Sequence, residues 1–185
     1  MATKVAIYDT TLRDGSQTEG VSFSTEDKLD LLKRLDHFGV DFIEGGWPGS
    51  NPKDVAFFEA ASRMPMEHAR LVAFGSTRRA GVEAEQDRNL AMLVSSGAPC
   101  IAIFGKTWDL HVTNALKISL EDNLELVRDS VSYLKAHGKE VVFDAEHFFD
   151  GYARNPRYAL DVLDAAASAG ADWLTLCDTN GGTMT

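Results

Sequence analysis

One repeated pattern constrains the fold of this chain more than any other feature. Four times, a stretch with helical character ends in glycine, and an apolar stretch of strand length begins within two residues; the glycines are Gly39, Gly97, Gly138 and Gly170. Glycine adopts the left-handed conformation that closes many helices, so we expect each to follow a last helical turn. Each strand-plus-helix unit would then take roughly 30 to 40 residues, as expected of βαβ units. The chain should therefore alternate strands and helices.

Signals for helix starts support this alternation. They stand at four points: capping boxes at Ser24–Asp27 and Ser119–Asp122, and Asn-Pro steps at 51–52 and 155–156. In a capping box each side chain bonds the backbone of the other residue, and proline is tolerated at the first helical position because its missing N–H has no intrahelical partner there. Five helices are predicted between six strands.

The strands are predicted at 4–8, 41–45, 70–74, 100–104, 140–145 and 172–177. Continuous apolar strands separated by helices indicate a parallel sheet covered by helices. An open doubly wound sheet and a (β/α)8 TIM barrel both fit this order. Polar residues follow nearly every strand, and the first strand lacks a G-x-G-x-x-G motif, which favours the barrel. Because a barrel usually needs about 250 residues, we expect residues 1–185 to be the N-terminal part of one catalytic barrel, truncated to about six βα units, without strands 7 and 8 or C-terminal domains.

Composition excludes several classes of function. The formal net charge is -10 and there is no stripe of lysine and arginine, which argues against nucleic-acid binding. The sequence has no apolar run of membrane-spanning length and no signal-peptide pattern, so we expect no membrane contact. Cys100 and Cys177 lie in apolar runs, as expected for buried thiols in a reducing cytoplasm.

Charged side chains gather directly after the first strand, in YDTTLRDGSQTEG at residues 8–20. Arg13 is permanently cationic and can donate hydrogen bonds to a carbonyl or carboxylate oxygen, whereas Asp14 is an oxygen ligand suited to a divalent cation. Together they could bind a ketone, with the metal polarising it and the arginine stabilising the developing charge. Alternatively, the pair only fixes the turn before Gly15.

This motif resembles the signature of the isopropylmalate, homocitrate and citramalate synthase family, metal-dependent TIM-barrel acyltransferases grouped with the hydroxymethylglutaryl-CoA lyases. The resemblance continues, in family order and over essentially the whole chain, through FIEGGWPGSNPKD, VVFDAEHFFDGY and LCDTNGGT. The stretches GGWPGSNPKD and DAEHFFDGY look most like the citramalate synthase branch.

The resemblance implies roles for seven side chains. Arg13 matches the arginine that contacts the keto oxygen and stabilises the enolate, and Asp14 matches the carboxylate that binds the metal. Glu146 matches a glutamate beside the keto acid, and it is the one candidate general base in this chain. The implied substrate-side residues are Gln17, Glu44, His111 and Thr179, of which Thr179 holds the substrate carboxylate.

Structural explanations compete with several of these roles. Glu44 could anchor the turn before Gly45, and Glu146 could form a structural ion pair with His147. We assign His37 and His137 to the ends of helices, where a cation interacts favourably with the helix dipole.

One family feature is absent from the sequence. The family completes its metal site with a His-x-His pair on the seventh strand, and this chain has five histidines but no such pair. The remaining ligands are therefore expected beyond Thr185, and the 185-residue piece alone should be inactive or nearly so. Its open sheet edges should also favour self-association.

The implied reaction is a Claisen-type condensation of acetyl-CoA with the 2-keto acid pyruvate to give citramalate, in cytoplasmic synthesis of the branched-chain amino acids isoleucine and leucine. A divalent cation (Mg, Mn or Zn) is implied as cofactor, and a homo-oligomer as assembly. The alternatives are 2-isopropylmalate or homocitrate synthase, a lyase running the reverse cleavage, and a non-catalytic barrel remnant that serves as an interaction module.

Overall fold

The computed structural model describes residues 5–184, which form two compact units. The first unit comprises residues 5–75 and 92–101, and the second comprises 76–91 and 102–184. The strands follow chain order in one sheet, β1-β2-β3-β4-β5-β6, and the pairs β1–β2, β2–β3 and β5–β6 are parallel. This confirms the predicted alternation, because parallel neighbours require a crossover between them.

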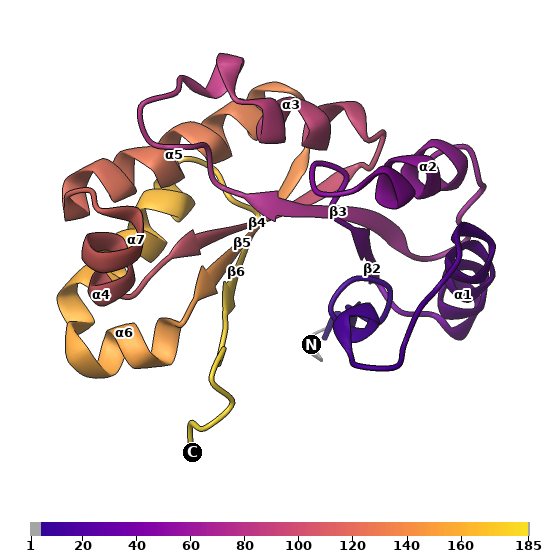
Figure 1. Ribbon diagram of the computed structural model, residues 1–185, viewed down its shortest axis with the longest axis horizontal. Coiled ribbons are helices and arrows are strands. Elements are labelled where there is room, and N and C mark those ends of the chain that lie inside the picture. The colour runs from indigo at the N-terminus through magenta and orange to yellow at the C-terminus, as the bar shows by residue number, and fades with distance from the viewer. Residues whose placement is uncertain (1–4, 185) are drawn as a thin grey trace, which may run out of the picture. The chain divides into compact units, whose positions relative to one another are not determined.

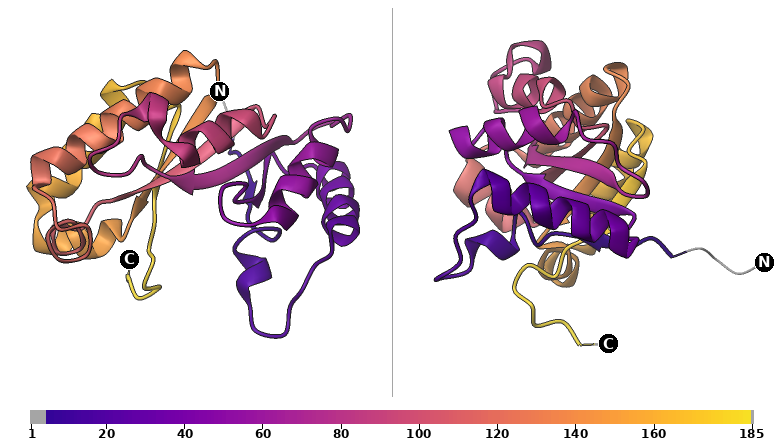
Figure 2. Two further views of the ribbon diagram at one scale, coloured as in Figure 1. Left: turned by 45° about the horizontal axis from the view of Figure 1, so that its top comes forward. Right: turned by 90° about the vertical axis from the view of Figure 1, so that its right-hand side faces the viewer.

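The first unit is built from strand–helix repeats. Its elements are β1 (Tyr8–Asp9), the short 3-10 helix η1 (Gly15–Gln17), α1 (Thr25–Phe38), β2 (Phe42–Gly46), α2 (Pro52–Ala61) and most of β3 (Arg70–Ser76), with the second half of α3 (Arg88–Ser95) and the start of β4 (Cys100–Lys106). The helices α1 and α2 run side by side and both pack against β2 (Figure 1 and Figure 2). Leu32 of α1 and Phe57 of α2 are fully buried in the resulting core.

The second unit continues the same repeat. Its elements are η2 (Ala84–Gln86), the rest of β4, α4 (Asp109–His111), the π-helical turn η3 (Val112–Leu116), α5 (Leu120–Ala136), β5 (Glu140–Glu146), α6 (Phe148–Arg154), α7 (Pro156–Ser168) and β6 (Trp173–Leu176). The helices α5 and α7 pack against each other, and both contact β5 (Figure 1). Val131 of α5, Phe143 of β5 and Val162 of α7 are fully buried in this core.

The predicted helix ends are confirmed. Gly39, Gly97, Gly138 and Gly170 have φ values of 91°, 78°, 70° and 99°, in the left-handed region. Both capping boxes are formed, and each Asn-Pro step starts a helix. Local chemistry therefore located the starts of α1, α2, α5 and α7, because caps depend only on neighbouring residues. It did not predict α4 and α6, which begin without a side-chain cap.

The first strand is shorter than predicted. The expected range of 4–8 begins outside the described residues, and pairing covers only Tyr8–Asp9. Val5 and Ile7 are 77% and 55% exposed, so their apolar character did not signal a buried strand. The backbone N–H of Ile7 instead donates to the carboxylate of Asp41 at 2.9 Å.

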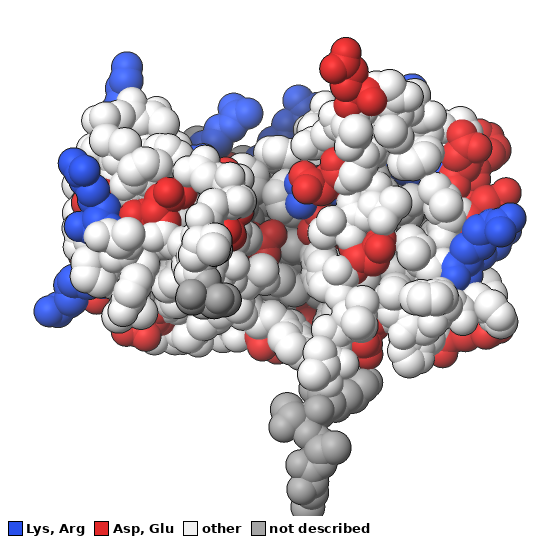
Figure 3. Space-filling model, turned by 90° about the horizontal axis from the view of Figure 1, so that it is seen from below, with Lys and Arg blue, Asp and Glu red and all other residues white. Residues whose placement is uncertain are grey.

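The surface carries charges of both signs. Figure 3 shows aspartate and glutamate side chains spread over one face, with lysine and arginine side chains also reaching it. Within residues 5–184, every helix falls short of the length and apolar character needed to cross a bilayer.

The loop before β3 is held by one aspartate. Asp36 of α1 is 6% exposed, and its carboxylate accepts the backbone N–H groups of Glu67, His68 and Ala69 at 2.8, 2.9 and 2.7 Å. Although burial opposes ionisation, these hydrogen bonds hold the pKa of Asp36 below its ordinary value. The carboxylate therefore stabilises the fold in its charged form.

Replacing Asp36 with alanine should lower the free energy of unfolding by about 3 to 5 kcal/mol, because three backbone donors lose a charged acceptor. Urea denaturation measures this loss. Because the folded pKa is depressed, the contribution is present above the unfolded pKa of about 3.9 and fades as the pH falls through the lower folded value. The control is Asp30→Ala on the exposed face of α1, which should change stability by less than about 0.5 kcal/mol. Equal effects of the two substitutions would contradict the anchoring role.

Candidate active site

The predicted site residues fall into two clusters, one in each unit. The first is centred on Glu44 of β2, whose side chain is fully buried. Its carboxylate accepts a hydrogen bond from the Tyr8 hydroxyl at 2.6 Å and one from Nε of Arg13. These contacts tie β1 and the loop after it to β2. They show that Glu44 does more than anchor the turn before Gly45.

Burial raises the pKa of Glu44, while the neighbouring Arg13 and Tyr8 oppose that rise. A buried carboxylate is costly unless it is paired, so the arginine and the glutamate stabilise each other's position. The Nε of Arg13 is therefore held by a residue of strand β2 and not by a loop residue.

Arg13 is held on a second side by an aromatic ring. Its guanidinium carbon lies 3.9 Å from the ring centroid of Phe74 in β3, and Phe74 makes an edge contact with Trp47. Its Nη1 contacts Asp14 at 3.1 Å. The side chain is still 17% exposed. A cation stacked on a ring and bonded to a buried carboxylate is preorganised to donate to a ligand oxygen.

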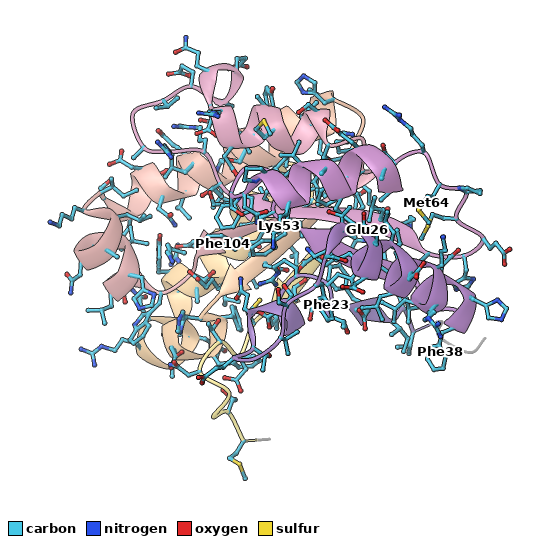
Figure 4. The ribbon with its side chains drawn as sticks, turned by 45° about the vertical axis from the view of Figure 1, so that its right-hand side comes forward. Phe23, Glu26, Phe38, Lys53, Met64 and Phe104 are labelled. Carbon is cyan, nitrogen blue, oxygen red and sulfur yellow. The ribbon has the colours of Figure 1, made fainter. Side chains whose placement is uncertain are left out.

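Asp14 directly precedes the short η1 segment, and Gln17 ends it. The Asp14 side chain is 63% exposed, and Gln17 and Arg13 line a hollow of about 440 Å³ in the first unit. Phe23 and Lys53, labelled in Figure 4, also line this hollow. Because Arg13 itself lines the hollow, the hollow offers space for part of a substrate beside the guanidinium.

The described residues do not form a complete metal centre. Asp14 contributes one accessible carboxylate, and residues 5–184 contain no group of three or more histidine, cysteine, aspartate or glutamate side chains placed to hold a metal ion. Magnesium and zinc sites in proteins use several ligands, so one carboxylate already bonded to Arg13 does not fit the role alone.

Replacing Glu44 with glutamine tests this first cluster. The neutral amide keeps the volume but loses an acceptor, so stability should fall by about 1 to 3 kcal/mol. Because the folded pKa of Glu44 is raised, wild-type stability relative to the variant should decrease as the pH rises from about 4.3 towards the folded value. Urea denaturation at pH 4 and pH 7 measures the difference. Exposed Glu59→Gln should show no such trend, and a gap that widens with pH would contradict the raised pKa.

The second cluster lies at the carboxyl ends of β4 and β5. Lys106 ends β4, Glu146 ends β5, and their side chains form an ion pair through Nζ and Oε2. Both are about one quarter exposed. The alternative that Glu146 pairs with His147 is wrong, because His147 bonds Asp150 instead. Glu146 is therefore held by a lysine from the neighbouring strand.

His111 lies in a group of three rings. Its ring centroid is 4.8 Å from that of Trp108 and 4.6 Å from that of His147, the latter edge to face. Burial, with His147 and Lys106 nearby, lowers the pKa of His111. A neutral imidazole is therefore expected at this position at neutral pH.

Thr179 is linked to this cluster through the backbone. Its hydroxyl accepts the N–H of His147 at 2.9 Å, which connects the segment after β6 to the end of β5. Asp178 accepts from the backbone N–H and the hydroxyl of Thr183, so its carboxylate holds the turn that follows. The structure thus brings Thr179 to His147.

The clusters also contain residues that were not predicted as site residues. Tyr8 bonds Glu44 and Lys106 bonds Glu146, at separations of 36 and 40 positions, and Asp150 bonds His147 three positions away. Lys106 carried one usable signal, its position at the end of an apolar strand. The Asp150 contact could have been suspected from its i, i+3 spacing on a helix start.

A parallel βα chain with charged residues at the carboxyl ends of its strands is typical of the (β/α)8-barrel fold. The chain belongs to the HMGL-like family, whose model matches residues 4–185. It is 59% identical over 184 residues to the (R)-citramalate synthase of Aquifex aeolicus, covering 100% of this chain and 35% of that protein. The chain thus spans about a third of the length of the curated relatives it matches. The predicted family and fold class are confirmed.

Two further comparisons concern the branch of the family and the fold. The probable 2-isopropylmalate synthase of Methanopyrus kandleri is 36% identical over 183 residues, covering 98% of this chain and 34% of that protein. The crystal structure of HMG-CoA lyase from Bacillus subtilis superposes with a TM-score of 0.74 at 20% identity, over 97% of this chain and 60% of that one. The lyase comparison shows the barrel fold alone.

Proposed function

We propose that the protein containing this chain condenses acetyl-CoA with pyruvate and hydrolyses the thioester to give citramalate and CoA. The proposal depends on the placement of Arg13, whose guanidinium is bonded to buried Glu44 and stacked on Phe74. Such a donor suits a keto oxygen that becomes negatively charged as the carbon–carbon bond forms. The 59% identity to a citramalate synthase, against 36% to an isopropylmalate synthase, supports pyruvate as the keto acid.

In this proposal each site residue of the chain has a defined role. Arg13 donates to the keto oxygen, with Glu44 keeping it in place. Glu146, ion-paired with Lys106, removes a methyl proton from acetyl-CoA. Thr179 binds the substrate carboxylate, and Gln17 and His111 lie on the substrate side.

A divalent cation belongs to the proposal as well, and Asp14 is the ligand that this chain would contribute. The other ligands are expected from residues beyond Thr185. Magnesium, manganese and zinc are all candidates. We also propose a cytoplasmic homo-oligomer, with small-molecule substrates and no nucleic-acid or membrane partner.

The experiment is a rate comparison between keto acids with the complete protein. Release of free CoA from acetyl-CoA should be fastest with pyruvate, and the product should have the mass of citramalate. A branched five-carbon keto acid should react at least about 10-fold more slowly, since misplaced methyl groups change rates by factors of this size. Preference for the branched acid would favour isopropylmalate synthesis, and no reaction with either would favour a non-catalytic role.

A further inference from the structure

His147 has an unusual backbone conformation between β5 and α6. Its φ of 55° and ψ of 37° lie in the left-handed region, which is energetically unfavourable for a residue other than glycine. The conformation is fixed by its N–H, which donates to Thr179, and by its ring Nδ1, which lies 2.9 Å from Oδ2 of Asp150. Such strain persists where surrounding contacts determine it, often at functional sites.

Asp150 is itself held in place. It lies in the first turn of α6, and its carboxylate accepts a second hydrogen bond from Nδ2 of Asn180 at 2.9 Å. The hydrogen bond from His147 lowers the pKa of Asp150, so this group is a carboxylate at neutral pH. A carboxylate at Nδ1 selects the tautomer with its proton on that nitrogen, which leaves the lone pair on Nε2.

The Nε2 atom of His147 can accept a proton. Among the described residues it has no hydrogen-bond partner, and the side chain is only 15% exposed. The ring centroids of His111 and Trp108 lie 4.6 and 5.9 Å from that of His147, so two aromatic rings pack against the imidazole. Glu146, the neighbouring residue, is already paired with Lys106. Two distinct base candidates therefore stand at the end of one strand.

The proposed reaction, on which this inference rests, needs two proton removals. One takes a proton from the methyl group of acetyl-CoA, and the other takes a proton from the water that cleaves the thioester. An imidazole oriented by a carboxylate is the arrangement that removes a proton from a hydroxyl group in hydrolytic triads. We propose that His147 is the general base for thioester hydrolysis and that Asp150 is its positioning residue.

The step balances without another reactant. The water oxygen attacks the thioester carbonyl carbon while its proton passes to Nε2 of His147. The tetrahedral intermediate then collapses, the carbon–sulfur bond breaks, and the departing CoA sulfur takes the proton from Nε2. Citramalate and CoA leave, and the imidazole returns to its neutral form.

The test uses His147→Asn in the complete protein, because asparagine tolerates the left-handed conformation better than most residues. In a quenched single turnover with acetyl-CoA and pyruvate, the variant should form citramalyl-CoA at close to the wild-type rate. Release of free CoA should fall by about 100-fold or more, so the thioester should accumulate and be visible by mass spectrometry. Asp150→Asn should show the same split, with a loss of about 10-fold or more.

The control is His137→Asn at the exposed end of α5, which should leave both steps unchanged. Wild-type CoA release in either variant would overturn the assignment of that residue. Equal loss of condensation and hydrolysis in both variants would also overturn it, because that pattern indicates a structural role. If the wild-type protein forms citramalyl-CoA and neither substitution slows the hydrolysis of this thioester, this inference alone is refuted. If the wild-type protein forms no carbon–carbon bond, the proposed function is refuted.

Discussion

Replacing Arg13 with lysine in the complete protein should lower kcat/KM for citramalate formation by about 100- to 1,000-fold, the usual cost of losing a preorganised donor to a developing oxyanion. Lysine keeps a positive charge near Glu44 but cannot reproduce the planar fork that bonds Glu44 and Asp14 while lying on Phe74. Steady-state assay of CoA release measures the change.

Lysine is a better test substitution than alanine, because alanine would also destabilise the fold. Alanine would leave the Glu44 carboxylate buried without its cation, which costs about 3 to 5 kcal/mol when a buried pair is broken. The variant Arg13→Ala would therefore confuse a loss of folding with a loss of catalysis. The matched control is Arg157→Lys, whose side chain is 89% exposed, and it should retain full activity. Full activity in Arg13→Lys would remove Arg13 from the mechanism.

Replacing Glu146 with glutamine should lower turnover by about 100- to 10,000-fold, the range attributed to a positioned general base. Glutamine keeps the shape of the side chain but cannot take a proton, and it leaves Lys106 without its ion-pair partner. The block should fall before carbon–carbon bond formation, so neither citramalyl-CoA nor free CoA should appear in a single turnover.

That pattern separates Glu146 from His147, for which citramalyl-CoA should accumulate. Glu121→Gln on α5 is the control, since its side chain is 69% exposed and its contact with Arg128 is 3.3 Å long. Accumulation of citramalyl-CoA in Glu146→Gln would contradict its role as the first base and assign it to hydrolysis.

The fold was largely predictable from the sequence because its signals are local. Gly39 closes α1 and Ser24 opens it, and each acts through residues within four positions. The first strand was predicted less well because Val5 and Ile7 are apolar yet exposed, which sequence pattern cannot reveal. Pairing with β2, and not hydrophobicity, determines where β1 begins.

The site was predictable only in part, for a related reason. The motif resemblance identified Arg13 and Glu146 as candidates, but it did not identify their partners. Glu44 lies 31 positions from Arg13, and Lys106 lies 40 positions from Glu146. These pairs form because parallel strands place their carboxyl ends side by side, which becomes evident only when strand order and register are known. The left-handed backbone of His147 had no sequence signal at all, because glycine is the residue expected there.

The most direct measurement is a crystal structure of the complete protein with pyruvate bound. We expect the guanidinium of Arg13 to lie within about 3 Å of the keto oxygen, a normal hydrogen-bond distance, while its Nε still bonds Glu44. Pyruvate bound away from Arg13, with the guanidinium contacting only Glu44 and Asp14, would contradict this role of Arg13.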